Sequence, residues 1–220
     1  MKNIKAIIFD AYGTLFDVNS AAEKCKDKIG DKWEGFANYW RTTQLEYTWL
    51  RSLMKRHRDF WQVTEDSLDK SMKAYEIDSS MRNELLDLYK ILSPFKEVPE
   101  VLKTLKEKNF KLSILSNGTP ALLNELVKSN NLENIFDDIF SIEEVGVYKP
   151  DSKVYDIPIK KYQIQKNEVT FLSANTWDVS GAGNYGYSSI WVNRNQSIFD
   201  NLDYDPNHKI ENLSELLPLI

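Results

Sequence analysis

The chain has 220 residues, 42% of them hydrophobic, so it can bury the core of one domain, or of a domain that carries an inserted second one. Its 28 Lys and Arg residues against 33 Asp and Glu residues give a net charge of −5, which excludes a broad basic surface for nucleic acid. We therefore expect the partner to be a small molecule.

The single cysteine, Cys25, has no second cysteine with which to form an internal disulfide. Because Lys24 and Lys26 flank it on a charged stretch, we interpret it as structural. The apolar stretch near the N-terminus is short and ends at Asp10, so we expect neither a signal peptide nor a membrane span. These features favour a cytoplasmic protein.

The first predicted strand covers residues 4–9, "IKAIIF". Its β-branched and aromatic residues are typical of a strand that is buried on both faces of a parallel sheet. Asp10 follows at the carboxyl edge, where open α/β sheets bind ligands, and Gly13 allows the tight turn there. Taken alone, Asp10 has the alternative interpretation of a turn residue or a helix cap.

A helical insert is predicted next, because residues 17–92 contain no good strand and no proline. Apolar residues recur there at helical spacing: Trp33, Phe36, Ala37, Trp40, Leu45, Trp49 and Leu53. Pro94 and Pro99 mark the return from the insert. We therefore predict a core domain of residues 1–16 and 96–220 and a helical domain of residues 17–95.

Helix and strand patterns alternate after the insert, which predicts an α/β fold with a doubly wound parallel sheet. The predicted helices cover residues 100–108 and 120–128, with two more that begin near 151 and after 176, and the predicted strands cover 110–115, 138–141, 168–173 and 188–193. Pro158 falls inside the third of these helices, and we expect it to kink or shorten that helix.

Polar side chains follow three of the later predicted elements: Ser116 and Asn117, then Lys149, then Ser173, Asn175 and Asp178. Each group alone is also typical of a turn, a solvated loop or the start of a helix. A doubly wound sheet, however, brings its carboxyl strand ends together over one crevice. The pattern therefore favours one shared site that includes Asp10.

Together, "FDAYGTL", "LSNG", "YKP" and "SANTWD" resemble the haloacid dehalogenase superfamily, and specifically its L-2-haloacid dehalogenase branch. The insert segment "YWRTTQLEYTWLRSLM" resembles the helical cap of that branch, so the likeness covers nearly the whole chain. The resemblance implies a hydrolase that converts L-2-haloacids to D-2-hydroxy acids and halide through an aspartyl ester, without a cofactor or metal.

Tyr12 agrees with the dehalogenase branch. Phosphatases of this superfamily have a second aspartate two positions after the nucleophile, because an alkoxide leaving group must be protonated as it departs. A halide is a stable anion that needs no proton, so Tyr12 at this position suits dehalogenation and handicaps hydrolysis of phosphate esters.

The resemblance also implies roles for residues of the first step. Asp10 is the nucleophile, Thr14 orients it, and Lys149 offsets the charge of the substrate. The substrate carboxylate is held by Ser116 and by backbone N–H groups near Ala11 and Tyr12.

Further roles follow for the halide and the water. The halide is received by Arg41 and Asn117, with Tyr155 steadying Arg41. Asp178, positioned by Ser173 and Asn175, activates the water that cleaves the ester. Apolar walls are expected from Leu45, Phe60 and Trp177, whose alternative interpretation is ordinary core packing.

One departure and two histidines stand outside this scheme. Thr42 occupies a position where the branch more commonly has glutamine, so the resemblance does not fix the shape of the halide side of the pocket. His57 and His208 match no role, and we interpret both as structural or surface residues.

Three alternatives stay open. The first is a Mg²⁺-dependent phosphatase of the same superfamily, with Asp10 and Asp178 as metal ligands. The second is a related ring-opening hydrolase for a strained substrate, and the third is a binding or scaffold protein with an inactive site. Because the insert has more apolar positions than one core face needs, we also expect a homodimer formed partly through residues 40–55.

Overall fold

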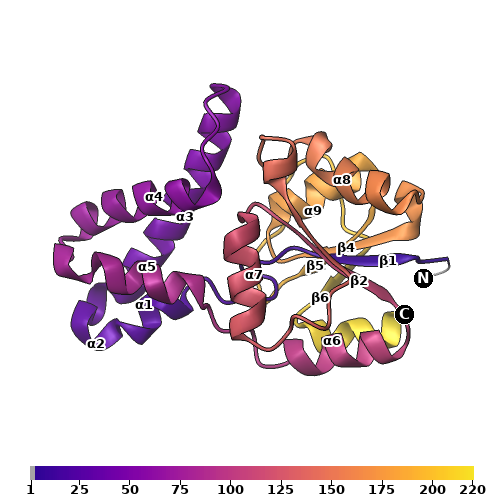
Figure 1. Cartoon of the computed structure of the whole chain (residues 1–220), viewed down its shortest axis with the longest axis horizontal. Coiled ribbons are helices and arrows are strands. Elements are labelled where there is room, and N and C mark those ends of the chain that lie inside the picture. Colours follow the sequence, from indigo (N-terminus) through magenta and orange to yellow (C-terminus); the bar gives the residue numbers. More distant parts are fainter. Residues whose placement is uncertain (1–2) are drawn as a thin grey trace.

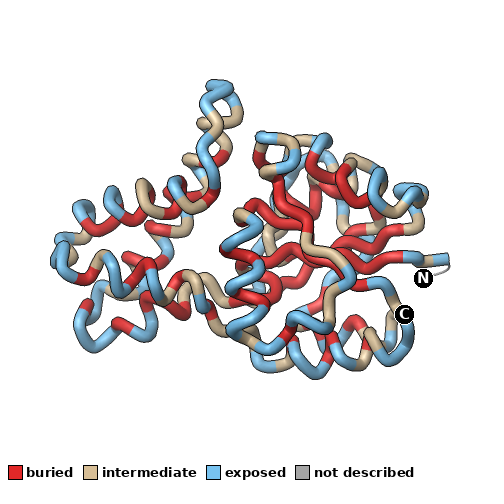
Figure 2. Tube along the Cα trace, viewed as in Figure 1, coloured by how far each residue is buried: buried red, intermediate tan, exposed pale blue. Residues whose placement is uncertain are grey.

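The centre of the fold is a sheet of six strands in the order β3-β2-β1-β4-β5-β6, and all neighbouring pairs are parallel. The structure, a computed structural model, describes residues 3–220. Its strands are β1 (Ala6–Phe9), β2 (Lys111–Ser116), β3 (Asp138–Ser141), β4 (Val169–Ser173), β5 (Ser188–Val192) and β6 (His208–Ile210). β1 and β4, adjacent in the middle, are buried at every residue, as their apolar sequences require (Figure 2).

Helices cover both faces of this sheet. They are α6 (Val98–Glu107), α7 (Pro120–Ser129), α8 (Ser152–Tyr162) and α9 (Thr176–Tyr185). Figure 1 shows α8 and α9 on one side of the sheet and α6 with the C-terminal segment on the other. The predicted doubly wound α/β fold is therefore confirmed. The order in which strands are added to the sheet reverses between β1 and β4, because β2 and β3 lie on one side of β1 and β4 to β6 on the other, and this switch opens a crevice at the carboxyl ends of β1 and β4.

The insert forms a helical part beside the sheet, on the left in Figure 1. Its helices are α1 (Ser20–Lys24), α2 (Lys26–Ile29), α3 (Trp33–Leu53), α4 (Phe60–Tyr75) and α5 (Arg82–Lys90). The chain enters and leaves side by side: the N–H of Asp17 donates to the carbonyl of Ser93 at 2.8 Å, and the N–H of Phe95 to that of Leu15 at 3.0 Å. Among residues 3–220, no helix has the length and apolar character needed to cross a membrane.

Two expectations about elements were wrong or incomplete. α8 continues past the buried Pro158 to Tyr162, so the expected shortening at the proline was wrong, because a single missing N–H removes only one helical hydrogen bond. β6 was not predicted, nor was the 3₁₀ segment Leu213–Leu219 that follows it. Both are short, and β6 is an edge strand that exposes two of its residues.

Candidate active site

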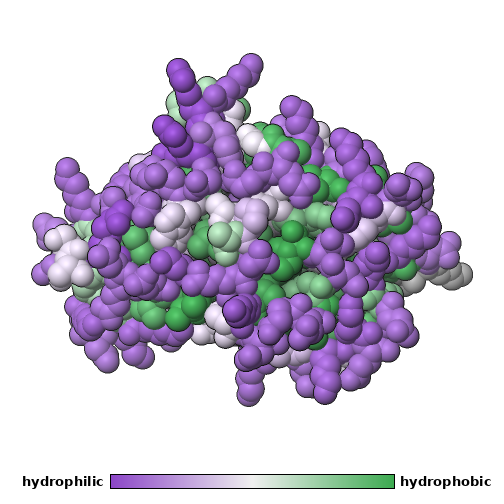
Figure 3. All heavy atoms as spheres, viewed as in Figure 1, coloured by the Kyte–Doolittle hydropathy of each residue, from purple (hydrophilic) through white to green (hydrophobic). Residues whose placement is uncertain are grey.

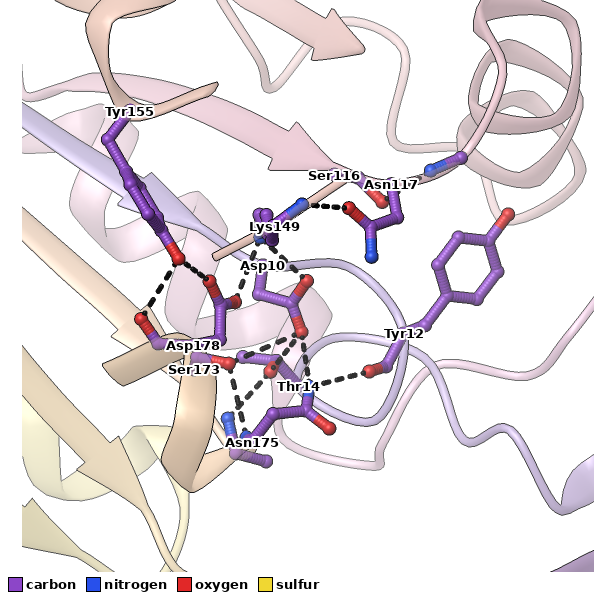
Figure 4. A network of polar contacts seen from close by, with 12 residues as sticks. Asp10, Tyr12, Thr14, Ser116, Asn117, Lys149, Tyr155, Ser173, Asn175 and Asp178 are labelled. Carbon is purple, nitrogen blue, oxygen red and sulfur yellow. Dashed lines mark hydrogen bonds and ion pairs between the residues drawn. The ribbon is translucent and has the colours of Figure 1, made fainter. Parts of the chain in front are cut away.

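Asp10 leaves β1 directly into the crevice and is only 5% exposed. Gly13, at φ +89°, adopts the left-handed conformation that glycine tolerates, and the turn brings Thr14 back onto Asp10. The Oδ2 atom of Asp10 accepts hydrogen bonds from Thr14 Oγ1 at 3.0 Å, Asn175 Nδ2 at 2.9 Å and Ser173 Oγ at 3.4 Å (Figure 4). Three donors therefore hold one oxygen of this carboxylate.

Lys149 lies between two carboxylates. Its Nζ is 3.1 Å from Asp10 Oδ1 and 2.9 Å from Asp178 Oδ2, and its side chain is 1% exposed. Burial alone lowers the pKa of Lys149, but the adjacent charges of Asp10 and Asp178 outweigh burial and raise it. Lys149 is therefore a fixed positive charge at the nucleophile.

Asp178 is fully buried at the start of α9. Burial, reinforced by the charge of Asp10, raises its pKa to about 6, although Lys149 and the hydroxyl of Tyr155 favour its charged form. Tyr155 Oη donates to Asp178 Oδ1 at 2.8 Å. This contact needs Gly181, because a Cβ there would lie 2.6 Å from the Tyr155 hydroxyl. A carboxylate that titrates near neutrality suits a general base.

Several donors face the same crevice. The backbone N–H groups of Ala11 and Tyr12 form no hydrogen bond within the described chain. Asn117 Oδ1 accepts from the N–H of Lys149 at 3.1 Å, and Figure 4 shows its amide nitrogen pointing toward the space between Asp10 and Tyr12. The Ser116 Oγ atom, also buried here, accepts from the N–H of Gly118 at 3.1 Å. The arrangement can bind an anion beside Asp10.

The helical part reaches this crevice through Arg41. Its Nη2 lies 3.4 Å from the carbonyl of Tyr12, to which it donates, and its Nη1 donates to Gln44 Oε1 at 2.9 Å. The buried ring of Tyr12 packs against Phe60, with ring centres 5.1 Å apart, and stacks on Tyr89 at 5.7 Å. Arg41 and these rings join the helical part to the loop that carries the nucleophile.

The expectation that Tyr155 steadies Arg41 is wrong. The hydroxyl of Tyr155 donates to Asp178, inside the sheet part, because α8 packs against α9 there. The polar residues beside Arg41 are Gln44 and Tyr89, which sequence reasoning missed. Gln44 follows Arg41 at helical i, i+3 spacing, a signal that could have found it. Nothing in the sequence marks Tyr89.

The residues expected as apolar walls lie between the two parts of the molecule. Phe60 is buried against Tyr12, and Trp177 packs edge-on against Trp49 of α3 with ring centres 5.4 Å apart. Leu45 is half-buried on α3. Thr42 is exposed, and the hydrogen bonds of Arg41 go to Gln44 and Tyr12.

The structure also places the two histidines and the cysteine that the sequence singled out. His57 pairs with Glu143 at 2.9 Å between the helical part and the sheet part, His208 is exposed, and Cys25 is buried without a disulfide. No group of three or more His, Cys, Asp or Glu side chains that could hold a metal ion gathers within residues 3–220. The Asp10 and Asp178 oxygens instead contact Lys149.

A buried aspartate with a lysine and a second carboxylate beside it, at the switch point of a doubly wound sheet, is the arrangement expected of a hydrolase that uses an aspartate nucleophile. The comparisons agree. Residues 4–186 match the family model "haloacid dehalogenase-like hydrolase", and the chain belongs to this family, as the sequence motifs predicted.

Relatives and solved structures narrow the class. An (S)-2-haloacid dehalogenase of Pseudomonas fluorescens is 38% identical over 218 residues, which cover 98% of this chain and 96% of that protein. A dehalogenase crystal structure superposes with a TM-score of 0.98 at 35% identity, covering 100% of this chain and 98% of that one. The L-2-haloacid dehalogenase of Xanthobacter autotrophicus, solved with chloropropionic acid covalently bound, gives a TM-score of 0.91 at 32% identity and covers 98% of both chains.

Proposed function

We propose that this protein is an (S)-2-haloacid dehalogenase, which hydrolyses L-2-haloacids to D-2-hydroxy acids and halide. The observation that carries the proposal is the setting of Asp10: it is buried, faces the charge of Lys149, and is followed two positions later by Tyr12 in place of a proton-donating acid. Such a site provides a desolvated carboxylate nucleophile for a leaving group that needs no proton.

The first step forms the ester. Asp10 Oδ2 already accepts three hydrogen bonds, whereas Oδ1 contacts Lys149, so Oδ1 is the oxygen with a lone pair left to attack the α-carbon. The substrate carboxylate binds the N–H groups of Ala11 and Tyr12, with Ser116 beside them. Lys149 offsets the repulsion between that carboxylate and Asp10.

The halide departs on the side away from Asp10, because displacement is in line. Arg41 and Asn117 supply its hydrogen-bond donors, and Phe60, Leu45 and Trp177 exclude water. Exclusion of water removes the hydration that would slow the carboxylate, and fixed alignment supplies part of the roughly 7 to 11 kcal/mol available from positioning.

The second step cleaves the ester. After attack through Oδ1, Asp10 Oδ2 is the ester carbonyl oxygen, and Thr14 and Asn175 are already placed to stabilise the negative charge that develops on it. Asp178 takes the proton of the attacking water, which adds to the Asp10 carbonyl carbon. As the bond between Asp10 Cγ and Oδ1 breaks, the proton that Asp178 took passes to Oδ1, and the hydroxy acid leaves with inverted configuration and with its bond between Oδ1 and the α-carbon intact.

Assembly and domain division are part of the proposal. α3 ends in an arm at the top of Figure 1 whose apolar side chains are exposed: Leu50 at 43%, Leu53 at 79% and Met54 at 60%. On the face in Figure 3 most residues are hydrophilic, and three of the six exposed large hydrophobic residues within 3–220 lie on this arm. We assign residues 40–55 to a homodimer contact, residues 17–95 to a cap, and residues 1–16 and 96–220 to the core. The lone, buried Cys25 supports a cytoplasmic location.

No observation favours the phosphatase alternative: Tyr12 supplies no acid for an alkoxide, and Lys149 already pairs with both carboxylates that a metal would use. The test is halide release from L- and D-2-chloropropionate against a panel of phosphate esters, each with EDTA or Mg²⁺. We expect halide from the L-isomer alone, unchanged by EDTA. Turnover of phosphate esters with a strict Mg²⁺ requirement would reverse the assignment.

A further inference from the structure

The amide of Gln44 is a buried polar group that the proposed mechanism does not use. It lies on α3, one turn after Arg41, and is 1% exposed. Burying an amide costs free energy unless it is hydrogen-bonded, so the partners of Gln44 decide what it is for.

All four hydrogen-bonding positions of this amide are filled. Nε2 donates to Thr64 Oγ1 at 2.7 Å and to Tyr89 Oη at 3.0 Å, while Oε1 accepts from Arg41 Nη1 at 2.9 Å and from Tyr89 Oη at 3.3 Å. The proton of Thr64 is committed to the carbonyl of Phe60 at 2.7 Å, so Thr64 can only accept from Gln44. This fixes the amide with Nε2 toward α4 and Oε1 toward Arg41.

The fixed orientation of Gln44 also determines how Arg41 meets the loop that carries the nucleophile. With Nη1 of Arg41 bound to Gln44, Nη2 faces the carbonyl of Tyr12 at 3.4 Å. The ring of Tyr89 stacks on that of Tyr12 at an angle of 17°, and burial raises the pKa of Tyr89, so its hydroxyl stays protonated and able to donate. These contacts hold the long side chain of Arg41 in one conformation, whereas a free arginine side chain would sample several.

We propose that Gln44 is a positioning residue that holds the guanidinium of Arg41 over the crevice, ready to receive the departing halide. The inference rests on the proposed function of Arg41 and adds a residue to it. Loss of one hydrogen bond to a charged group predicts a fall of about tenfold to a hundredfold in kcat/KM.

The first test does not depend on activity. In Gln44→Met the side chain keeps its size but loses the acceptor, and Thr48→Val is the matched control, since Thr48 is equally buried on α3 and its hydroxyl donates to the carbonyl of Leu45. ¹⁵N relaxation of the Arg41 Nε–Hε pair, assigned by its loss in Arg41→Lys, reports the motion of the guanidinium. We expect the order parameter of this Nε–Hε pair to be about 0.85 in the wild type and in Thr48→Val, and to fall below about 0.6 in Gln44→Met. An equally rigid Arg41 in Gln44→Met overturns the proposal.

The second test asks whether Gln44 acts only through Arg41. Rates with L-2-bromopropionate are measured for Gln44→Met, Arg41→Ala and the double variant, with melting temperatures as a check on folding. We expect Gln44→Met to cost nothing further once Arg41 is gone, whereas losses that multiply would show that Gln44 is merely structural. A wild type that releases no halide would refute the proposed function, and the relaxation data would still decide the role of Gln44.

Discussion

Lys149→Met is predicted to destabilise the protein in a strongly pH-dependent way. Lys149 Nζ lies 3.1 Å and 2.9 Å from two carboxylate oxygens, and at an effective dielectric constant near 20 each contact gains about 5 kcal/mol of Coulomb energy. Most of this offsets the cost of removing three charges from water. The net loss on removing the lysine is the cost of leaving buried charge unpaired, about 3 to 5 kcal/mol.

The pH dependence follows from Asp178, whose folded pKa of about 6 lies above its ordinary value. Without Lys149 this pKa rises further, so the folded variant binds a proton that the unfolded chain releases. A carboxyl with a raised folded pKa loses stability as pH rises through the unfolded and then the folded value. The deficit should therefore be small near pH 5 and reach its full size near pH 8.

Urea unfolding at both pH values measures the deficit, with Lys153→Met as control, because Lys153 is exposed on α8. The control should stay within about 0.5 kcal/mol of the wild type at both pH values. An equal loss for Lys149→Met at pH 5 and pH 8 would show that the lysine does not balance buried carboxylates.

Three further predictions follow from the site and the arm. Because Asp178 acts as a base, the rate of ester hydrolysis should fall about tenfold per pH unit below the pKa of its carboxyl in single-turnover assays. This pKa is about 6 in the free enzyme and lower in the ester, where Asp10 no longer carries the charge that raises it, and a flat profile would remove Asp178 from that step. Asp178→Asn should form the ester and fail to cleave it, so mass spectrometry should find the Asp10 peptide carrying the acyl group, while Ser180→Ala on the same helix should turn over normally. Light scattering should show that Leu53→Asp converts the dimer to a monomer. Ile198, which is 92% exposed away from the arm, provides the control, and Ile198→Asp should stay dimeric. A wild type that is monomeric at all concentrations would refute the dimer.

The sheet was predictable because its signals are local. β1 is apolar along its whole length, which a strand buried on both faces must be, and parallel strands bring their carboxyl ends together whatever the loops do. Asp10, Lys149 and Asp178 could therefore be placed in one site before any coordinate was known, although 139 residues separate the first two.

The contacts of the helical part were less predictable. Gln44 and Tyr89 are 45 residues apart on different helices, and their meeting depends on how those helices pack, which periodicity does not encode. The prediction that Tyr155 steadies Arg41 was wrong for the same reason. The sequence indicated the helix that carries Tyr155, but the partner of its hydroxyl depends on the close approach of α9 at Gly181. The strand β6 also depends on pairing with β5, since the N–H of Asn193, just after β5, donates to the carbonyl of Ile210 in β6 at 2.7 Å.

The central claim is that Asp10 attacks carbon, and the path of oxygen tests it most directly. With enzyme in excess over L-2-chloropropionate in H₂¹⁸O, one turnover transfers an Asp10 oxygen to the product, and water replaces that oxygen in the carboxylate. Mass spectrometry should then find an unlabelled hydroxy acid and one labelled oxygen in the peptide that contains Asp10. Label in the product of that first turnover, with none in Asp10, would show that water attacks the substrate directly and that the covalent mechanism is wrong.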